Sequence, residues 1–449
     1  MTPDTKSIAE RLVETARKYG ASAADAAVVS TRSFSIDVRE SRLEKAESSE
    51  SIQFGLRVFL GEKSACVSAS NPNFETFKEV ALRAVAMANV APRDEFSGLA
   101  EPNELSKNTS GTELELCDDY KCVKNLDVLK HMAFEIENSA LAVEGVTQCE
   151  GTGINTNFSD FYMATSNGFS AGYQTSYYQL FCSAIAEQNS YMEKDFSIEN
   201  RIFFCDLPQP SEIGLKAGQR AAERLSPRRP PTGNYPVLFS ERISSSLISH
   251  LISAISGNAI TRGSSWMQDN LGKAILPKGL NLREDPFRKR VFGSRPFDGE
   301  GLPTAKKNFV ENGELTSWVL DLRSSRILKL KPTGNGSRSL SSPPTSSVGN
   351  LELIDGTLSY ENLLLEMGTG LLVTSLIGST INPITGDYSR GASGFWVENG
   401  QVKYPVNECT IAGNLKDILK NLIPANDFKN HLSRVIPSLL VDGITIAGK

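Results

Sequence analysis

Residues 242–256 form the stretch with the most direct bearing on chemistry, because they place a histidine on a predicted helix. A helical zinc hydrolase needs a second histidine about one turn further on and a glutamate beside the first as general base. Here Leu251 follows His250, and Ile255 lies where a second ligand would be needed. The segment is instead an amphipathic helix, whose apolar face consists of Ile243, Leu247, Ile248, Leu251, Ile252 and Ile255.

His250 alone allows three interpretations: a relic metal ligand, a substrate contact, or a neutral hydrogen-bonded side chain at the edge of the core. The last is the ordinary state of an isolated histidine on such a helix. The chain has three histidines in all, and His131 and His431 have no partner at metal-ligand spacing. The sequence therefore predicts no metal site in this chain.

Asp298 and Glu300, within Phe-Asp-Gly-Glu-Gly, are the best-placed carboxylate pair. Paired acids can catalyse hydrolysis if their pKa values are pushed apart. Carboxylates in a glycine-rich turn more often accept hydrogen bonds from backbone N–H groups. Ser389 and Ser393 have no nearby histidine or lysine to activate them. We therefore assign no catalytic residue.

Residues 386–394 are dense in small side chains, and Gly391 and Gly394 allow another backbone to approach closely. Such a loop suits a cleft for an extended peptide. A compact turn between strands explains the same composition, and Asp387 then pairs with Arg390.

The amino-acid composition limits the classes of function that the protein can have. The 449 residues include 40% hydrophobic and 22% charged residues, so we expect two large globular domains. A net charge of −5 offers no overall basic surface for nucleic acid. The basic run within residues 283–295 is a solvated loop or a contact for an acidic partner or nucleic acid.

Seven scattered cysteines without a CxxC motif indicate reduced thiols rather than a disulfide framework. The N-terminus lacks the apolar segment of a signal peptide, and no apolar stretch reaches the roughly 18 residues of a membrane helix. The sequence thus predicts a cytoplasmic protein without a membrane or nucleic-acid partner.

The periodicity of apolar residues predicts the elements that position these groups. In the first half we expect helices near 8–16, 74–90, 126–143 and 211–225, strands within 25–69 and 146–205, and a long loop at 92–118. The second half is mostly strand and turn, with Asn-Gly hairpins at 309–315 and 396–402 and a low-complexity loop at 332–350.

Four prolines mark residues 226–236 as a linker. We predict an α+β protein, with an N-terminal α/β two-layer domain at 1–225 and a β-rich C-terminal domain at 237–449.

Several sequence segments resemble the TldD/PmbA family, and within it the PmbA (TldE) type of subunit. They lie at 249–257, 296–304, 366–374, 384–400 and 408–417. The resemblance implies an α+β N-terminal domain and a β-rich C-terminal domain that dimerise. It also implies cytoplasmic proteolysis, in which TldD and TldE act together to mature a peptide antibiotic and degrade an antitoxin. The family's older label is modulator of DNA gyrase.

The resemblance also defines what this chain lacks. In the TldD subunit, a His-Glu-x-x-x-His helix and a cysteine near the C-terminus hold the catalytic zinc. Here Leu251 and Ile255 replace the glutamate and the second histidine, and no cysteine follows Cys409. These departures are similar to those of the TldE-type subunit, so zinc is expected only in a TldD-type partner.

Two hypotheses follow. In the first, the chain is a subunit of a TldD/TldE-type metallopeptidase that helps to hold an unfolded peptide. In the second, it is a stand-alone homodimer, either a peptide-binding protein or a metal-independent hydrolase. The candidate peptide-binding or interface residues are His250, Asp387, Arg390, Gly391 and Gly394.

Overall fold

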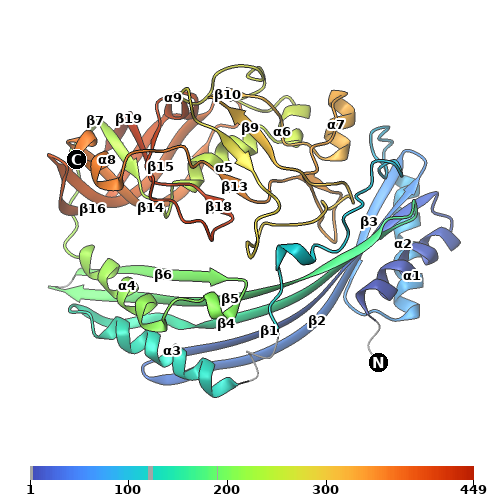
Figure 1. Cartoon of the computed structure of the whole chain (residues 1–449), viewed down its shortest axis with the longest axis horizontal. Coiled ribbons are helices and arrows are strands. Elements are labelled where there is room, and N and C mark those ends of the chain that lie inside the picture. Colours follow the sequence, from blue (N-terminus) through green and yellow to red (C-terminus); the bar gives the residue numbers. More distant parts are fainter. Residues whose placement is uncertain (1–3, 120–124, 190, 449) are drawn as a thin grey trace.

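The computed structural model describes residues 4–119, 125–189 and 191–448 (Figure 1). The first half is built on a six-stranded antiparallel sheet with the order β3-β2-β1-β4-β5-β6. Its strands are β1 (Ala23–Arg39), β2 (Arg42–Leu60), β3 (Lys63–Ala69), β4 (Val146–Thr165), β5 (Ser170–Gln188) and β6 (Tyr191–Arg201). The short strands predicted within 25–69 are therefore long strands that continue across polar residues.

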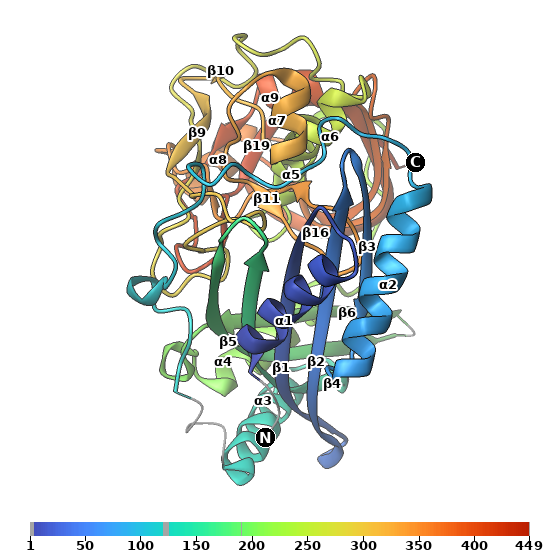
Figure 2. The same ribbon diagram turned by 90° about the vertical axis from the view of Figure 1, so that its right-hand side faces the viewer.

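Four helices cover one face of this sheet. The helices α1 (Thr5–Lys18) and α2 (Phe74–Val90) pack on β1–β3 at one end (Figure 2), and α3 (Leu126–Leu141) and α4 (Pro210–Glu223) pack on β4–β6 at the other. Apolar residues alternate along β1, so Val28 and Ile36 face the helices. The opposite, concave face looks toward the second half of the chain (Figure 1).

The second half contains a sheet in the order β16-β15-β14-β7-β19-β17, and an additional pairing of β16 with β19 closes five of its strands into a ring. The strands are β7 (Gly233–Phe239), β14 (Gly370–Ile381), β15 (Asp387–Glu398), β16 (Gln401–Asn414), β17 (Ile423–Pro424) and β19 (Leu439–Ala447). The helix α5 (Ser245–Ala254) adds its apolar face to the core beside these strands. It begins three residues after the predicted start.

Smaller elements complete the second half. A five-stranded sheet contains β8 (Leu282–Glu284), β9 (Lys307–Glu311), β10 (Glu314–Leu315), β13 (Leu351–Glu352) and β18 (Arg434–Val435). Short helices are α6 (Gly257–Thr261), α7 (Leu322–Leu328), α8 (Tyr360–Met367) and α9 (Leu415–Lys420). The α+β class predicted from the sequence is confirmed, and residues 224–232 connect α4 to β7.

Two predicted loops hold the halves together. Residues 332–350 include the strand pair β11 (Gly336–Ser337) and β12 (Thr345–Ser346), and the Arg338 side chain, 2% exposed, forms an ion pair with Asp25 of β1. The loop at 92–118 contains a 3-10 turn, η1 (Thr112–Leu114), and its backbone carbonyls at Phe96 and Leu99 accept hydrogen bonds from Arg326 of α7. Neither segment is a free surface loop.

Other sequence predictions can be placed in the same way. Six cysteines are free thiols, whereas Cys122 lies outside the described residues. The solvated-loop interpretation of 283–295 is wrong for Arg288 and Arg295, whose side chains are 12% and 16% exposed and lie beside glutamates. Within the described residues, no helix combines the length and apolar composition needed to cross a membrane.

Candidate functional site

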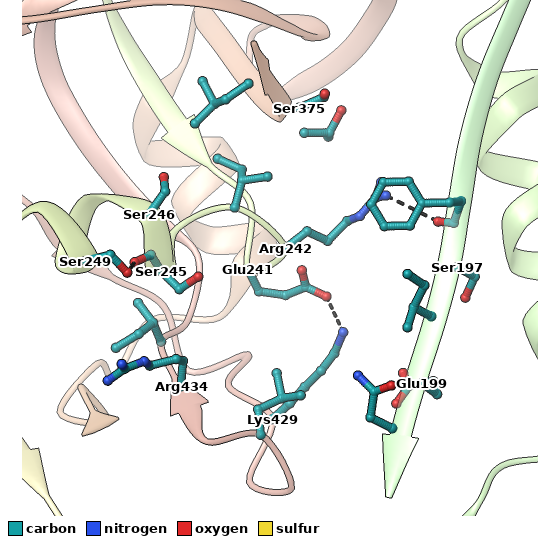
Figure 3. Close-up of a pocket in the computed structure, with 18 of the residues that line it drawn as sticks. Ser197, Glu199, Glu241, Arg242, Ser245, Ser246, Ser249, Ser375, Lys429 and Arg434 are labelled. Atoms are coloured by element: carbon teal, nitrogen blue, oxygen red, sulfur yellow. Dashed lines mark hydrogen bonds and ion pairs between the residues drawn. The ribbon is translucent and has the colours of Figure 1, made fainter. Parts of the chain in front are cut away.

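A cavity of about 780 Å³, lined in part by His250, lies where the two halves meet. Figure 3 shows part of its lining, including Glu199, Arg242 and Arg434. We call it the central pocket. One wall is formed by β6 and α4 of the first half. The other is formed by α5, β14, β15 and residues 429–436 of the second half. Because β6 is the last strand of its sheet, the pocket lies at a sheet edge.

An ion-pair cluster joins the two walls. Asp195 of β6 accepts hydrogen bonds from Arg242 at 2.6 Å and from Arg224 at 3.3 Å, and its side chain is 4% exposed. Burial favours the neutral acid, but hydrogen bonding and the charge of Arg242 outweigh it and lower the pKa of Asp195. The guanidinium of Arg242 also lies over the ring of Phe196, 5.0 Å from its centroid. This cluster fixes β6 against the start of α5.

A second set of ion pairs involves Glu199 and Glu241, and Figure 3 shows the pair of Glu241 with Lys429. Glu199 lies 3.2 Å from Nε2 of His431 and 2.8 Å from Arg201. Burial opposes ionisation of Glu199, but the close contact with His431 and the hydrogen bond from Arg201 lower its pKa to about 2. Glu241 pairs with Lys429. His431 is therefore a half-buried partner of a carboxylate.

His250 lies on α5 and lines the central pocket. Its ring is edge-on to that of Tyr388, with 6.0 Å between the centroids. Burial and the nearby charge of Arg390 lower the pKa of His250, so the imidazole is neutral at pH 7. Its Nε2 atom is buried and has no hydrogen-bond partner among the described residues. The expectation of a hydrogen-bonded histidine is wrong at this atom.

The surroundings of His250 do not fit a catalytic zinc. Leu251 and Ile255 are fully buried in the hydrophobic core. Cys409 is also buried, its thiol donates to the carbonyl of Ala392 at 3.1 Å, and burial raises its pKa to about 11. Across residues 4–119, 125–189 and 191–448, no three His, Cys, Asp or Glu side chains lie close enough together to hold a metal ion.

Residues 387–394 belong to the strand β15, so the loop predicted there is wrong. The exposed carboxylate of Asp387 accepts hydrogen bonds from Thr385 and Asn414, and the predicted pairing with Arg390 is not formed. The structure brings Arg390 and His250 into the wall of the central pocket, and Asp387 is not part of that wall.

The glycines of β15 have a packing role. A Cβ at Gly394 would lie 1.9 Å from the carbonyl oxygen of Leu372 on β14, whereas a Cβ at Gly391 would lie 3.5 Å from Ile377. Gly394 thus allows close approach within the sheet, and neither glycine lines the central pocket.

Asp298 and Glu300 are buried, with exposed fractions of 1% and 8%. Their carboxylates accept hydrogen bonds from backbone groups. Asp298 accepts from the N–H groups of Glu300, Leu302 and Gly336 at 2.8–2.9 Å, and Glu300 accepts from that of Leu322 at 2.7 Å. Burial first and the charge of Asp298 second raise the pKa of Glu300 to about 8. The structure supports the capping interpretation.

Most residues of the pocket carry no local sequence signal. Its charged walls come from five segments of the chain, and the members that the sequence did not indicate are Glu199, Lys216, Arg220, Glu241, Arg242, Lys429 and Arg434. Each appears alone as an ordinary charged residue on a helix, strand or turn. Their convergence depends on the contact of β6 with Arg242, just before α5.

In comparison with known proteins, three parts of the chain match three domain models of one family. Residues 24–88, 123–225 and 232–448 match the models of PmbA/TldA metallopeptidase domain 1, the central domain and the C-terminal domain. The chain is 33% identical over 449 residues to a protein named metalloprotease PmbA from Escherichia coli O157:H7, covering 99% of this chain and 97% of the relative.

Two crystal structures are similar over nearly the whole length. A proposed modulator of DNA gyrase from Bacteroides thetaiotaomicron has a TM-score of 0.91 and 25% identity, with all of both chains covered. TldE from Thermococcus kodakarensis has a TM-score of 0.84 and 21% identity over 98% of this chain and 99% of its own, which demonstrates a shared fold.

Proposed function

The chain belongs to the PmbA/TldD metallopeptidase family, and we propose that it is a PmbA/TldE-like subunit that lacks catalytic zinc. In this proposal it works in the cytoplasm, where it holds unfolded peptides for a zinc-bearing TldD-type partner. The central pocket is the site at which the peptide is held.

One observation carries this proposal: the helix α5 presents a single imidazole to the central pocket, where a zinc peptidase of this type needs two histidines and a glutamate on the helix, and the other imidazole of the pocket, that of His431, lies beside Glu199. His250 is in the pocket wall, while Leu251 and Ile255 are fully buried in the core. A catalytic zinc site uses three protein ligands and an activated water, and hydrolysis needs a general base. The described residues around His250 supply neither, so cleavage requires another chain.

The geometry also supports a role in peptide binding. The pocket is lined by residues Phe196–Asn200 of β6, an edge strand of its sheet. An extended peptide can pair with such an edge through its backbone, without recognition of particular side chains. Arg220 and Arg242 already donate to the carbonyl of Phe196, at 3.0 and 3.3 Å. The proposed pairing therefore uses backbone groups nearer to Asn200.

A stand-alone peptide-binding homodimer is the second candidate. It is favoured by the fact that one chain supplies walls on both sides of the pocket. A metal-independent hydrolase has less support, because Ser246 and His250 lie one turn apart on α5 without a hydrogen bond between Oγ and Nε2.

Co-purification from the native host tests the proposal. We expect the chain to recover a partner that contains His-Glu-x-x-x-His and zinc, and the isolated chain to bind unfolded peptide without cleaving it. Elemental analysis and a casein assay with and without a chelator provide the readouts. Stoichiometric zinc in the isolated chain, or cleavage that a chelator abolishes, would falsify the proposal.

A further inference from the structure

The carboxylates of the central pocket are already engaged. Among the described residues two acids line it, and Glu199 interacts with Arg201 and His431, while Glu241 interacts with Lys429. Each acid thus has a cationic partner of its own, although Oε2 of Glu241 is buried without a hydrogen-bond partner among the described residues.

Four cations of the pocket have no carboxylate within 4.0 Å in the described chain. They are Lys216, Arg220, Arg390 and Arg434. Burial and the charges of Lys429 and Arg220 lower the pKa of Lys216, and burial and the charge of Arg242 lower that of Arg220. Clustered cations that are partly removed from water are unfavourable unless an anion neutralises them. The electrostatics therefore favour an anionic ligand.

The same walls contain hydrogen-bonding groups that the protein leaves unused. Buried polar atoms without a hydrogen-bond partner among the described residues include Thr374 Oγ1, Ser246 Oγ, Arg390 Nε and Arg434 Nη1. All four residues line the central pocket. Buried donors are normally paired, so a wall with several unpaired ones fits a ligand that supplies acceptors.

A smaller depression, lined in part by Arg201 and Arg290, lies between the central pocket and an uncharged groove on the concave sheet face. This depression of about 250 Å³ shares Asn200 and His431 with the central pocket and shares Tyr177 and Phe292 with the groove of about 600 Å³. Hydroxyl and amide side chains dominate this groove: Ser33, Ser35, Asn155, Thr156, Asn157, Ser159, Thr175 and Gln179. A passage with one cationic end and one neutral polar end matches an extended peptide that ends in an anion.

We propose that the central pocket binds the C-terminal carboxylate of a peptide, whose preceding residues extend along the uncharged groove. The arginines are suited to this group, because a guanidinium donates two parallel hydrogen bonds to a carboxylate. The inference rests on the proposed function, since it specifies which end of the bound peptide the pocket holds.

Paired peptides provide the test. One uncharged ten-residue peptide, labelled at its N-terminus with a fluorophore, is prepared with a free C-terminus and as the C-terminal amide. Binding to the full chain is measured by fluorescence polarisation. We expect amidation to weaken binding by about tenfold or more, because hydrogen bonds to charged groups are stronger than neutral ones.

Variants locate the effect. Arg390→Gln and Arg434→Gln should each weaken binding of the free-carboxylate peptide toward that of the amide and leave binding of the amide unchanged. The control is Arg83→Gln, which removes the same charge from an exposed position on α2 outside the pocket and should alter neither peptide's affinity.

Two further measurements distinguish a terminal carboxylate from other sources of negative charge. An amidated peptide with one internal glutamate should bind no more tightly than the uncharged amide, and inorganic phosphate should compete weakly. Equal affinity for the free-acid and amide peptides would overturn the carboxylate site while leaving peptide binding intact. Failure of both peptides to bind would overturn the proposed function as well, and preferential binding of phosphate would contradict the peptide terminus as the ligand.

Discussion

Asp195 on β6 and Arg242, just before α5, form a 2.6 Å ion pair that joins the two halves of the chain at the central pocket. The two side chains are 4% and 15% exposed, and Arg224 from the end of α4 approaches the same carboxylate at 3.3 Å. Removing one member of such a buried cluster leaves uncompensated charge, which is more damaging than losing an exposed pair. Asp195 therefore holds β6 in the position that shapes the pocket.

The first prediction is that Asp195→Asn destabilises the protein by about 3 kcal/mol, because Arg242 and Arg224 lose their charged acceptor. The midpoint of thermal unfolding provides the measurement. Glu408→Gln is the matched control, since Glu408 pairs with Arg229 at the surface, with side chains 67% and 60% exposed. That change should cost about 0–1 kcal/mol. Equal effects of the two substitutions would contradict the role assigned to Asp195.

The second prediction concerns Glu300, whose pKa in the folded protein is raised to about 8. The unfolded chain loses this proton near the ordinary glutamate value of 4.5, so between about pH 4.5 and 8 the folded state binds more protons. Stability should therefore fall as pH rises through this window. In Glu300→Gln this component should disappear, so the variant's thermal midpoint should change less between pH 5.5 and 8.5. An unchanged pH dependence in the variant would exclude Glu300 as its source.

The third prediction separates the two glycines of β15. Gly394→Ala should lower the thermal midpoint strongly, because its Cβ would lie 1.9 Å from the carbonyl oxygen of Leu372 and the strands would have to move apart. Gly391→Ala should be tolerated, because the added Cβ would lie 3.5 Å from its nearest neighbour, Ile377, which is an ordinary van der Waals distance. If both variants unfold at the wild-type temperature, the close approach of β14 and β15 is not required.

The sequence predicts those elements that depend on local pattern. The helix at 74–90 has apolar residues at helical spacing, and α2 spans Phe74–Val90. The composition around Gly391 and Gly394 misleads, because small residues are frequent both in loops and in strands that pack closely. Residues 386–394 therefore suggested a turn, although Asp387–Glu398 form the strand β15, in which Tyr388 and Ala392 are both buried.

The central pocket could not be predicted in the same way. Glu199, Arg242 and Arg434 lie far apart in the sequence, and their side chains meet through the contact between β6 and the second half. Periodicity reports which face of an element is buried, but not which distant element covers it. Turn chemistry is more local, and for that reason the capping role of Asp298 and Glu300 could be inferred from five residues.

The last prediction is that restoring the zinc motif on α5 fails. Leu251→Glu places a carboxylate and Ile255→His an imidazole at positions that are fully buried among core residues. Loss of a large buried aliphatic side chain alone costs about 2–5 kcal/mol, and burial of an unpaired polar group adds to it. The double variant should unfold at a much lower temperature than the wild type and bind no stoichiometric zinc, because a third ligand is lacking among the described residues near His250. Thermal unfolding and elemental analysis measure the two effects.

Ser249→Glu, at an exposed position of the same helix, is the control and should fold normally. A stable double variant with one zinc per chain would show that α5 can present these side chains to the pocket.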